Sequence, residues 1–216
     1  MSTRKSPRLP CIPALPENCL LISYDLECQA SGPPNKPEEW VIPKAANGLG
    51  AAAFLWPERK LVPLPLAEAT FHRSIVPVVA RNAIASRFWT DNPDAEKVIH
   101  RKPVPMKVAA LDFLNWMVML KAEFGRKLAL IAGPHFFDVA QLADVMESAQ
   151  LLNWLQESTT LHDVRDSIAH HAKVDTKIAR QRYEVELKAL SWLVAHLDDH
   201  DSVAQGLAFF KALDAK

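Results

Sequence analysis

The chain has 216 residues, of which 49% are hydrophobic and 23% are charged. This composition is typical of a globular protein with a packed core and excludes a disordered chain. Basic and acidic residues number 25 each, so the net charge gives no long-range attraction to nucleic acid or to a membrane. No apolar run is long enough to cross a bilayer and no secretory signal is visible, so we expect a cytoplasmic protein.

The first half of the chain alternates proline-rich segments with strand patterns. Prolines recur through residues 1–18, which predicts an extended arm. The first strand is expected over residues 20–26, residues 48–56 and 60–65 suggest a hairpin, and residues 69–78 suggest a third strand. The pattern turns helical from residue 80, and the clearest helix spans residues 105–124, with Gly125 as its stop signal.

The second half of the chain is mainly helical. A strand is expected over residues 128–132, followed by helices over residues 138–146, 162–197 and 202–213. Early strands followed by a helix, a further strand and more helices predict an α/β fold with a mixed sheet.

Acidic residues follow the two most apolar strand patterns. Asp25 and Glu27 end the first strand and lie on the same face, because side chains alternate along a strand. Asp138 follows the strand at residues 128–132, where a helix cap is an equally natural role. Asp163 and Asp166 are three residues apart on one helical face, which is also a common pattern for exposed charges. Carboxylates that converge from different segments are what two-metal phosphodiester cleavage requires.

In this order and spacing the motifs resemble the DEDD 3′→5′ exonucleases, which include proofreading domains, oligoribonuclease and ribonuclease T. The matching features are Asp25-Leu-Glu27 after a strand, Phe137-Asp138 after a strand and a turn, and a helix that begins Asp163-Val-Arg-Asp-Ser-Ile-Ala. The segment 87–94 is similar to an FW-containing stretch of some family members. The resemblance covers residues 19–175.

The resemblance implies a ribonuclease H-like fold, in which a mixed central sheet is flanked by helices, with additional C-terminal helices. The chain would then divide into an arm (1–18), an exonuclease-like domain (19–175) and a helical extension packed on the same domain (176–216). The implied activity is removal of nucleotides from the 3′ end of single-stranded DNA or RNA with two Mg²⁺ or Mn²⁺ ions. The implied metal ligands are Asp25, Glu27, Asp138 and Asp163. The residues implied to contact the terminal nucleotide are Leu26, Cys28, His135 and Phe137.

The sequence departs from the family where the catalytic base is expected. Family members have a His five residues, or a Tyr four residues, before the last Asp, whereas this chain has Ser158 and Thr159, and neither is a good base near neutral pH. His162 could take that role in a shifted alignment, with Asp166 in place of Asp163 as the ligand. The alignment on Asp163 is preferred because it keeps the following Ser-Ile-Ala in register. A weakened or inactive binding module with the same fold is therefore the second hypothesis.

Overall fold

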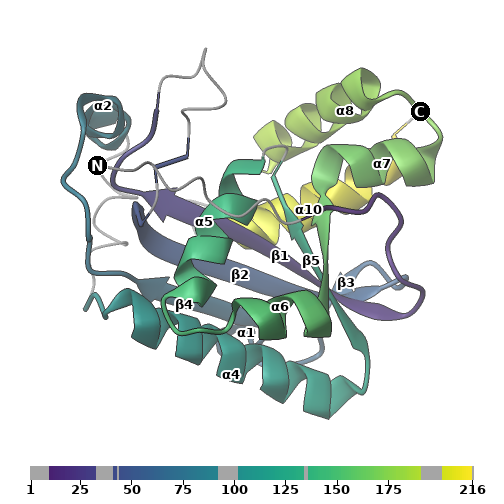
Figure 1. Ribbon diagram of the computed structural model, residues 1–216. Coiled ribbons are helices and arrows are strands. Elements are labelled where there is room, and N and C mark those ends of the chain that lie inside the picture. The colour runs from purple at the N-terminus through teal and green to yellow at the C-terminus, as the bar shows by residue number, and fades with distance from the viewer. Residues whose placement is uncertain are drawn as a thin grey trace.

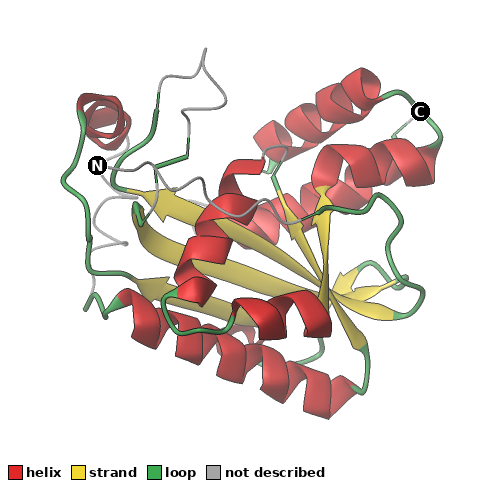
Figure 2. Ribbon diagram, in the orientation of Figure 1, coloured by secondary structure: helices red, strands yellow, loops and turns green. Residues whose placement is uncertain are grey.

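The computed structural model describes residues 10–32, 41–42, 44–91, 102–133, 136–190 and 201–215. These residues form a six-stranded mixed sheet with helices on both of its faces (Figures 1 and 2). The strand order is β3-β2-β1-β5-β6, and β4 pairs with β2. The predicted α/β class with a mixed sheet is confirmed.

The bounds of the elements are as follows. The strands are β1 (Cys19–Cys28), β2 (Ala46–Trp56), β3 (Lys60–Leu61), β4 (Thr70–Ser74), β5 (Lys127–Ala132) and β6 (Thr159–Asp163). The helices are α1 (Leu66–Ala69), α2 (Ala83–Asp91), α4 (Met106–Phe124), α5 (Phe136–Glu147), α6 (Leu152–Ser158), α7 (Val164–Ala172), α8 (Thr176–Ala189) and α10 (Asp201–Asp214). None of the described helices is both long enough and apolar enough to pass through a membrane.

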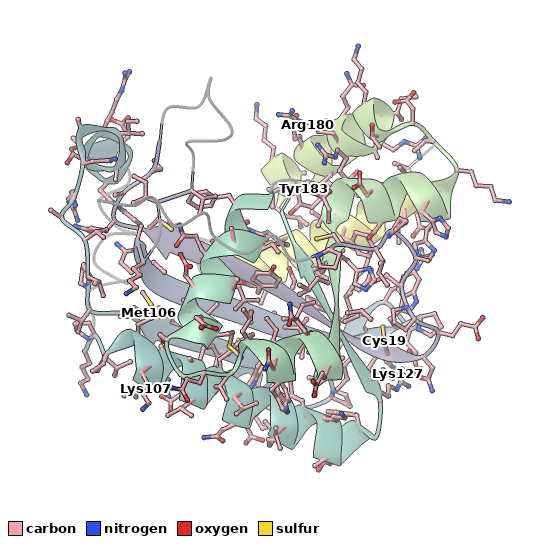
Figure 3. The ribbon with its side chains drawn as sticks, in the orientation of Figure 1. Cys19, Met106, Lys107, Lys127, Arg180 and Tyr183 are labelled. Carbon is pink, nitrogen blue, oxygen red and sulfur yellow. The ribbon has the colours of Figure 1, made fainter. Side chains whose placement is uncertain are left out.

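β1, β5 and β6 run parallel, so their carboxyl ends lie at the same end of the sheet. β1 is antiparallel to β2 and parallel to β5, and β5 is parallel to β6. Cys19 and Lys127 are register partners where β1 and β5 begin, and Figure 3 labels them side by side. Near the carboxyl ends of these strands, Tyr24 pairs with Ala132, and Ala132 pairs with Asp163. The residues at the carboxyl ends of β1, β5 and β6 are therefore neighbours.

Each face of the sheet has its own apolar core. Leu20, Ile22 and Tyr24 of β1 face a cluster that includes residues of α4 and α5. The alternate residues Cys19 and Leu21 face a second cluster that includes residues of α7, α8 and α10. This alternation is the period-two pattern of a strand that is covered on both sides. In Figure 1, α4 and α5 lie in front of the sheet and α10 lies behind it.

Most predicted elements are found with shifted ends, but the helix predicted over residues 162–197 is divided into α7 and α8, and α6 was not predicted. The left-handed backbone of Gly125, with φ of 63°, ends α4 as predicted. The predicted strand at 60–65 shortens to two residues. The helix predicted from residue 162 begins at Val164, because residues 159–163 form β6 instead. Hydrogen bonds to β5 hold residues 159–163 in a strand. Because β5 is distant in the sequence, the local pattern of these residues does not predict the pairing. Residues 191–197 of that prediction lie outside the described residues.

The described part of the N-terminal arm lies along β6, on the side away from β5. The Ile12 N–H donates to the Leu161 carbonyl over 2.9 Å, and the Leu15 N–H donates to His171 Nε2 over 3.2 Å. Exposed strand edges invite pairing with other chains. The arm gives part of this edge a partner within the same molecule.

Helix α10 packs closely on the sheet at Gly206. A Cβ atom at this position would lie inside contact distance of the Phe54 ring. Phe210 lies one turn further along and meets Phe54 edge to face, with ring centroids 5.3 Å apart. The absence of a side chain at Gly206 therefore sets the distance between α10 and β2.

We expect Gly206→Ala to destabilise the fold by about 1–3 kcal/mol, because the added methyl group overpacks the contact with Phe54. This sign is opposite to the gain of about 1 kcal/mol that Ala normally brings to a helix interior. Urea unfolding gives the free energy of unfolding. Lys211→Ala, at an exposed position of the same helix, is the control and should stay within about 0.5 kcal/mol of the wild type. A more stable Gly206→Ala variant would contradict the close contact.

Candidate active site

Three of the predicted acids lie near the carboxyl ends of the parallel strands. Asp25 is close to the end of β1 and is half-buried, Asp138 lies in the first turn of α5 and is buried, and Asp163 is the last residue of β6 and is also buried. The sheet register explains this convergence, because Tyr24, Ala132 and Asp163 are lateral neighbours.

Asp25 and Asp138 form a pair of like charges. The pKa of Asp138 lies well above its ordinary value, first because the carboxyl group is buried and second because of the nearby charge of Asp25. The Leu26 backbone N–H donates to Asp138 and opposes this rise. A Cβ atom at Gly133 would lie 3.7 Å from Asp138 Oδ2, so the carboxyl group rests against the end of β5.

Glu27 lies two residues after Asp25, near the end of β1. It is half-buried, and the register between β1 and β2 shifts directly after it. Such irregularities bend a strand and change the direction of the side chains beside it. Burial raises the pKa of the Cys28 thiol well above its ordinary value, and the charges of Asp138, Glu27 and Asp25 raise it further. All three carboxylates thus act electrostatically on the Cys28 thiol.

The two positions of β2 that pair with these acids have no side chains. The cross-strand partners of Asp25 and Glu27 are Gly50 and Gly48. Cross-strand partners point to the same face of a sheet. Nothing from the adjoining positions of β2 therefore covers the two carboxylates.

Asp163 acts as the N-cap of α7. Its Oδ1 accepts hydrogen bonds from the N–H groups of Arg165 and Asp166, over 2.8 and 3.2 Å, and its Oδ2 lies 3.5 Å from an Arg165 guanidinium nitrogen. Burial is the main cause that raises the pKa of Asp163. Asp166, the alternative ligand, has a side chain that is 45% exposed and contacts Arg165 over 3.4 Å. Asp163 is thus the cap of α7, whereas Asp138, which was also considered as a helix cap, lies inside the first turn of α5.

His162 is buried with both ring nitrogens engaged. Its Nδ1 lies 2.7 Å from the Ile12 carbonyl oxygen, and its Nε2 lies 2.8 Å from Thr160 Oγ1. A carbonyl oxygen only accepts, so Nδ1 carries the proton and Nε2 accepts from the Thr160 hydroxyl. Burial lowers the pKa of His162 to about 4, which agrees with this neutral form. The contacts give His162 a structural role in holding the arm, and they count against the predicted role as the base.

The residues predicted to contact the terminal nucleotide have different surroundings. The Leu26 side chain lies in the core and is not available to a ligand. The Leu26 backbone N–H donates to Asp138. Cys28 and Phe137 are half-buried beside the acids, at the end of β1 and the start of α5. His135 lies outside the described residues.

Two polar residues of this region were not predicted from the sequence. Tyr24 is fully buried, and its hydroxyl has no hydrogen-bond partner among the described residues. Burial raises the pKa of Tyr24, and the charges of Asp138, Cys11 and Asp163 raise it further. Gln205 of α10 donates from Nε2 to Asp25 Oδ1 over 3.1 Å. The position of Tyr24 next to Asp25 could have drawn attention to it, whereas no local signal marks Gln205.

The donor set is suited to a hard cation. Within the described ranges no three His, Cys, Asp or Glu side chains are placed to hold one metal ion together. Mg²⁺ is commonly bound by one or two carboxylates together with water and substrate phosphates. The pair of Asp25 and Asp138 fits that mode, because a cation between them would relieve the repulsion that raises the pKa of Asp138. Asp163 fits only after leaving its capping contacts.

Neither a family model nor a curated protein matches this sequence.

We expect Asp138→Asn to stabilise the fold at pH 8. The pKa of Asp138 is higher in the folded chain than in the unfolded chain, so its ionised form disfavours folding once the pH exceeds about 4. The neutral amide still accepts from the Leu26 N–H. The gain should be about 1–3 kcal/mol at pH 8 and small at pH 4. Chemical unfolding at both pH values tests this, with Asp166→Asn as the exposed control, and a loss of stability at pH 8 would contradict the charge repulsion.

We also expect acid to destabilise the protein through His162. The folded-state pKa of about 4 lies below the unfolded value of about 6.5, so the unfolded chain binds the extra proton and stability falls as the pH drops from 6.5 to 4. The contribution is at most about 3 kcal/mol. His162→Gln should show a smaller loss than the wild type over that range in urea unfolding. Equal slopes in both proteins would show that His162 is not held in its neutral form.

Proposed function

We propose that the chain is a metal-dependent 3′→5′ exonuclease that acts on the ends of single-stranded DNA or RNA. The observation that carries the proposal is the pair formed by the half-buried Asp25 and the buried Asp138 near the carboxyl ends of the parallel strands. Like charges in such a pair lower stability, and such arrangements are concentrated at functional sites. Cations that balance the two charges are the simplest reason for the pair to exist.

The sheet topology supports a ribonuclease H-like fold. β1, β2 and β3 form consecutive antiparallel pairs, and β5 and β6 then add in parallel on the other side of β1. This arrangement is compatible with the fold that the sequence motifs imply. Fold alone does not define activity, so the acidic residues supply the functional part of the proposal.

The roles of the residues follow from their contacts. Asp25 and Asp138 would hold Mg²⁺ or Mn²⁺, with Glu27 two residues beyond Asp25 on the same strand. Asp163 would join a second ion only after leaving its capping contacts with α7. A bound divalent cation polarises the phosphate and lowers the pKa of an attacking water molecule. The Leu26 N–H fixes the orientation of Asp138. Cys28 and Phe137, which are both half-buried, would contact the terminal nucleotide.

A second candidate is a nucleic-acid- or protein-binding module without turnover. It is favoured by the contacts around the expected base. Ser158 ends α6 at the place of the family His, and His162 has no ring nitrogen left for proton transfer. Tight oligonucleotide binding without cleavage in any divalent metal would favour this candidate.

The main test measures how fast a 5′-labelled single-stranded oligonucleotide is shortened from its 3′ end in the presence of Mn²⁺. We expect Asp25→Asn and Asp138→Asn each to reduce the rate by about 100-fold or more, because each removes a carboxylate that balances the cation charge. Asp112→Asn is the matched control, since Asp112 is an acid of α4 that pairs with Arg73 over 2.6 Å. Wild-type rates in both site variants would exclude the proposed site.

A further inference from the structure

Gln205 approaches the acidic pair from the last helix of the chain. Its Nε2 lies 3.1 Å from Asp25 Oδ1, and the residue is 7% exposed. Only the amide nitrogen can donate to a carboxylate, so this contact fixes the orientation of the amide group. The other end, Oε1, is buried and has no hydrogen-bond partner among the described residues.

The helix that carries Gln205 is firmly attached to the sheet. The next residue, Gly206, lies against Phe54, and Phe210 stacks on Trp56 with ring centroids 6.3 Å apart. Groups that orient a functional side chain are effective when their own positions are fixed by packing. The amide of Gln205 is held in this way.

We infer that Gln205 is a positioning residue, which holds the Asp25 carboxylate toward Asp138 and the divalent cation between them. The inference rests on the proposed function. A neutral amide orients the carboxylate without neutralising it, whereas Lys or Arg at the same position would form an ion pair and compete with the cation. Hydrogen-bond partners of metal-ligating carboxylates act in this manner.

Oε1 of Gln205 has no hydrogen-bond partner among the described residues, and the same is true of Oε1 of Gln141. What distinguishes Gln205 is that its amide contacts Asp25. Both amide atoms belong to one planar group, so Oε1 stays close to Asp25 when Nε2 donates to it. Mg²⁺ keeps several of its water molecules when bound, and such a water molecule is a suitable donor for Oε1.

The test compares Mn²⁺ binding in Gln205→Met and Gln141→Met. Each substitution keeps the side-chain volume and removes one buried amide, but the amide of Gln141 donates to the Ile42 carbonyl over 2.9 Å and not to an acid. We expect the Mn²⁺ dissociation constant of Gln205→Met to rise about 10-fold or more. The Mn²⁺ dissociation constant of Gln141→Met should stay within about 2-fold of the wild type. This control measures how much the loss of a buried amide hydrogen bond alone changes Mn²⁺ binding.

Gln205→Ala, which cannot overpack the site, is measured alongside, and thermal unfolding without metal checks that each variant is folded. An unchanged Mn²⁺ affinity in both Gln205 variants, or an equal loss in Gln141→Met, would overturn the positioning role while leaving the proposed function intact. If the unaltered chain binds no Mn²⁺ and shortens no oligonucleotide, the proposed function and this inference both fail.

Discussion

The repulsion between the buried carboxylate of Asp138 and the half-buried carboxylate of Asp25 is the constraint on which the candidate site depends. Asp25 comes from a central strand and Asp138 from the helix that follows its neighbour. The cost of placing them together is offset by a backbone donor at Leu26 and an amide donor at Gln205. None of these contacts removes the negative charge. In the proposed nuclease, a divalent cation would balance the charges of this pair.

Strand pairing and packing fix the positions of the acidic residues relative to one another. Parallel pairing of β1, β5 and β6 brings their carboxyl ends to one edge, and both faces are covered by apolar cores. The functional groups thus lie on elements that are fixed by packing on both sides. Ligands of open α/β sheets usually bind outside the carboxyl ends of the strands, and the acids of this chain lie in that position.

Sequence patterns were informative where a signal was local. The apolar run before Asp25 and the strand before Asp138 predicted both the elements and the candidate acids. The roles of Asp163 and His162 were not predictable, because capping of α7 and contact with the arm depend on tertiary geometry. The strand β6 was missed for the same reason, since its hydrogen bonds are with β5. Gln205 belongs to a helix whose amphipathic pattern indicates burial but not the partner it will meet.

The contact between Gln205 and Asp25 also determines when the site is completed during synthesis. The two residues are 180 positions apart in the chain, and a domain cannot form such a contact until the later segment has emerged. A nascent chain therefore carries its first carboxylates long before the helix that orients one of them. Contacts of this sequence separation slow folding, so the acidic site reaches its final geometry only when α10 packs on the sheet.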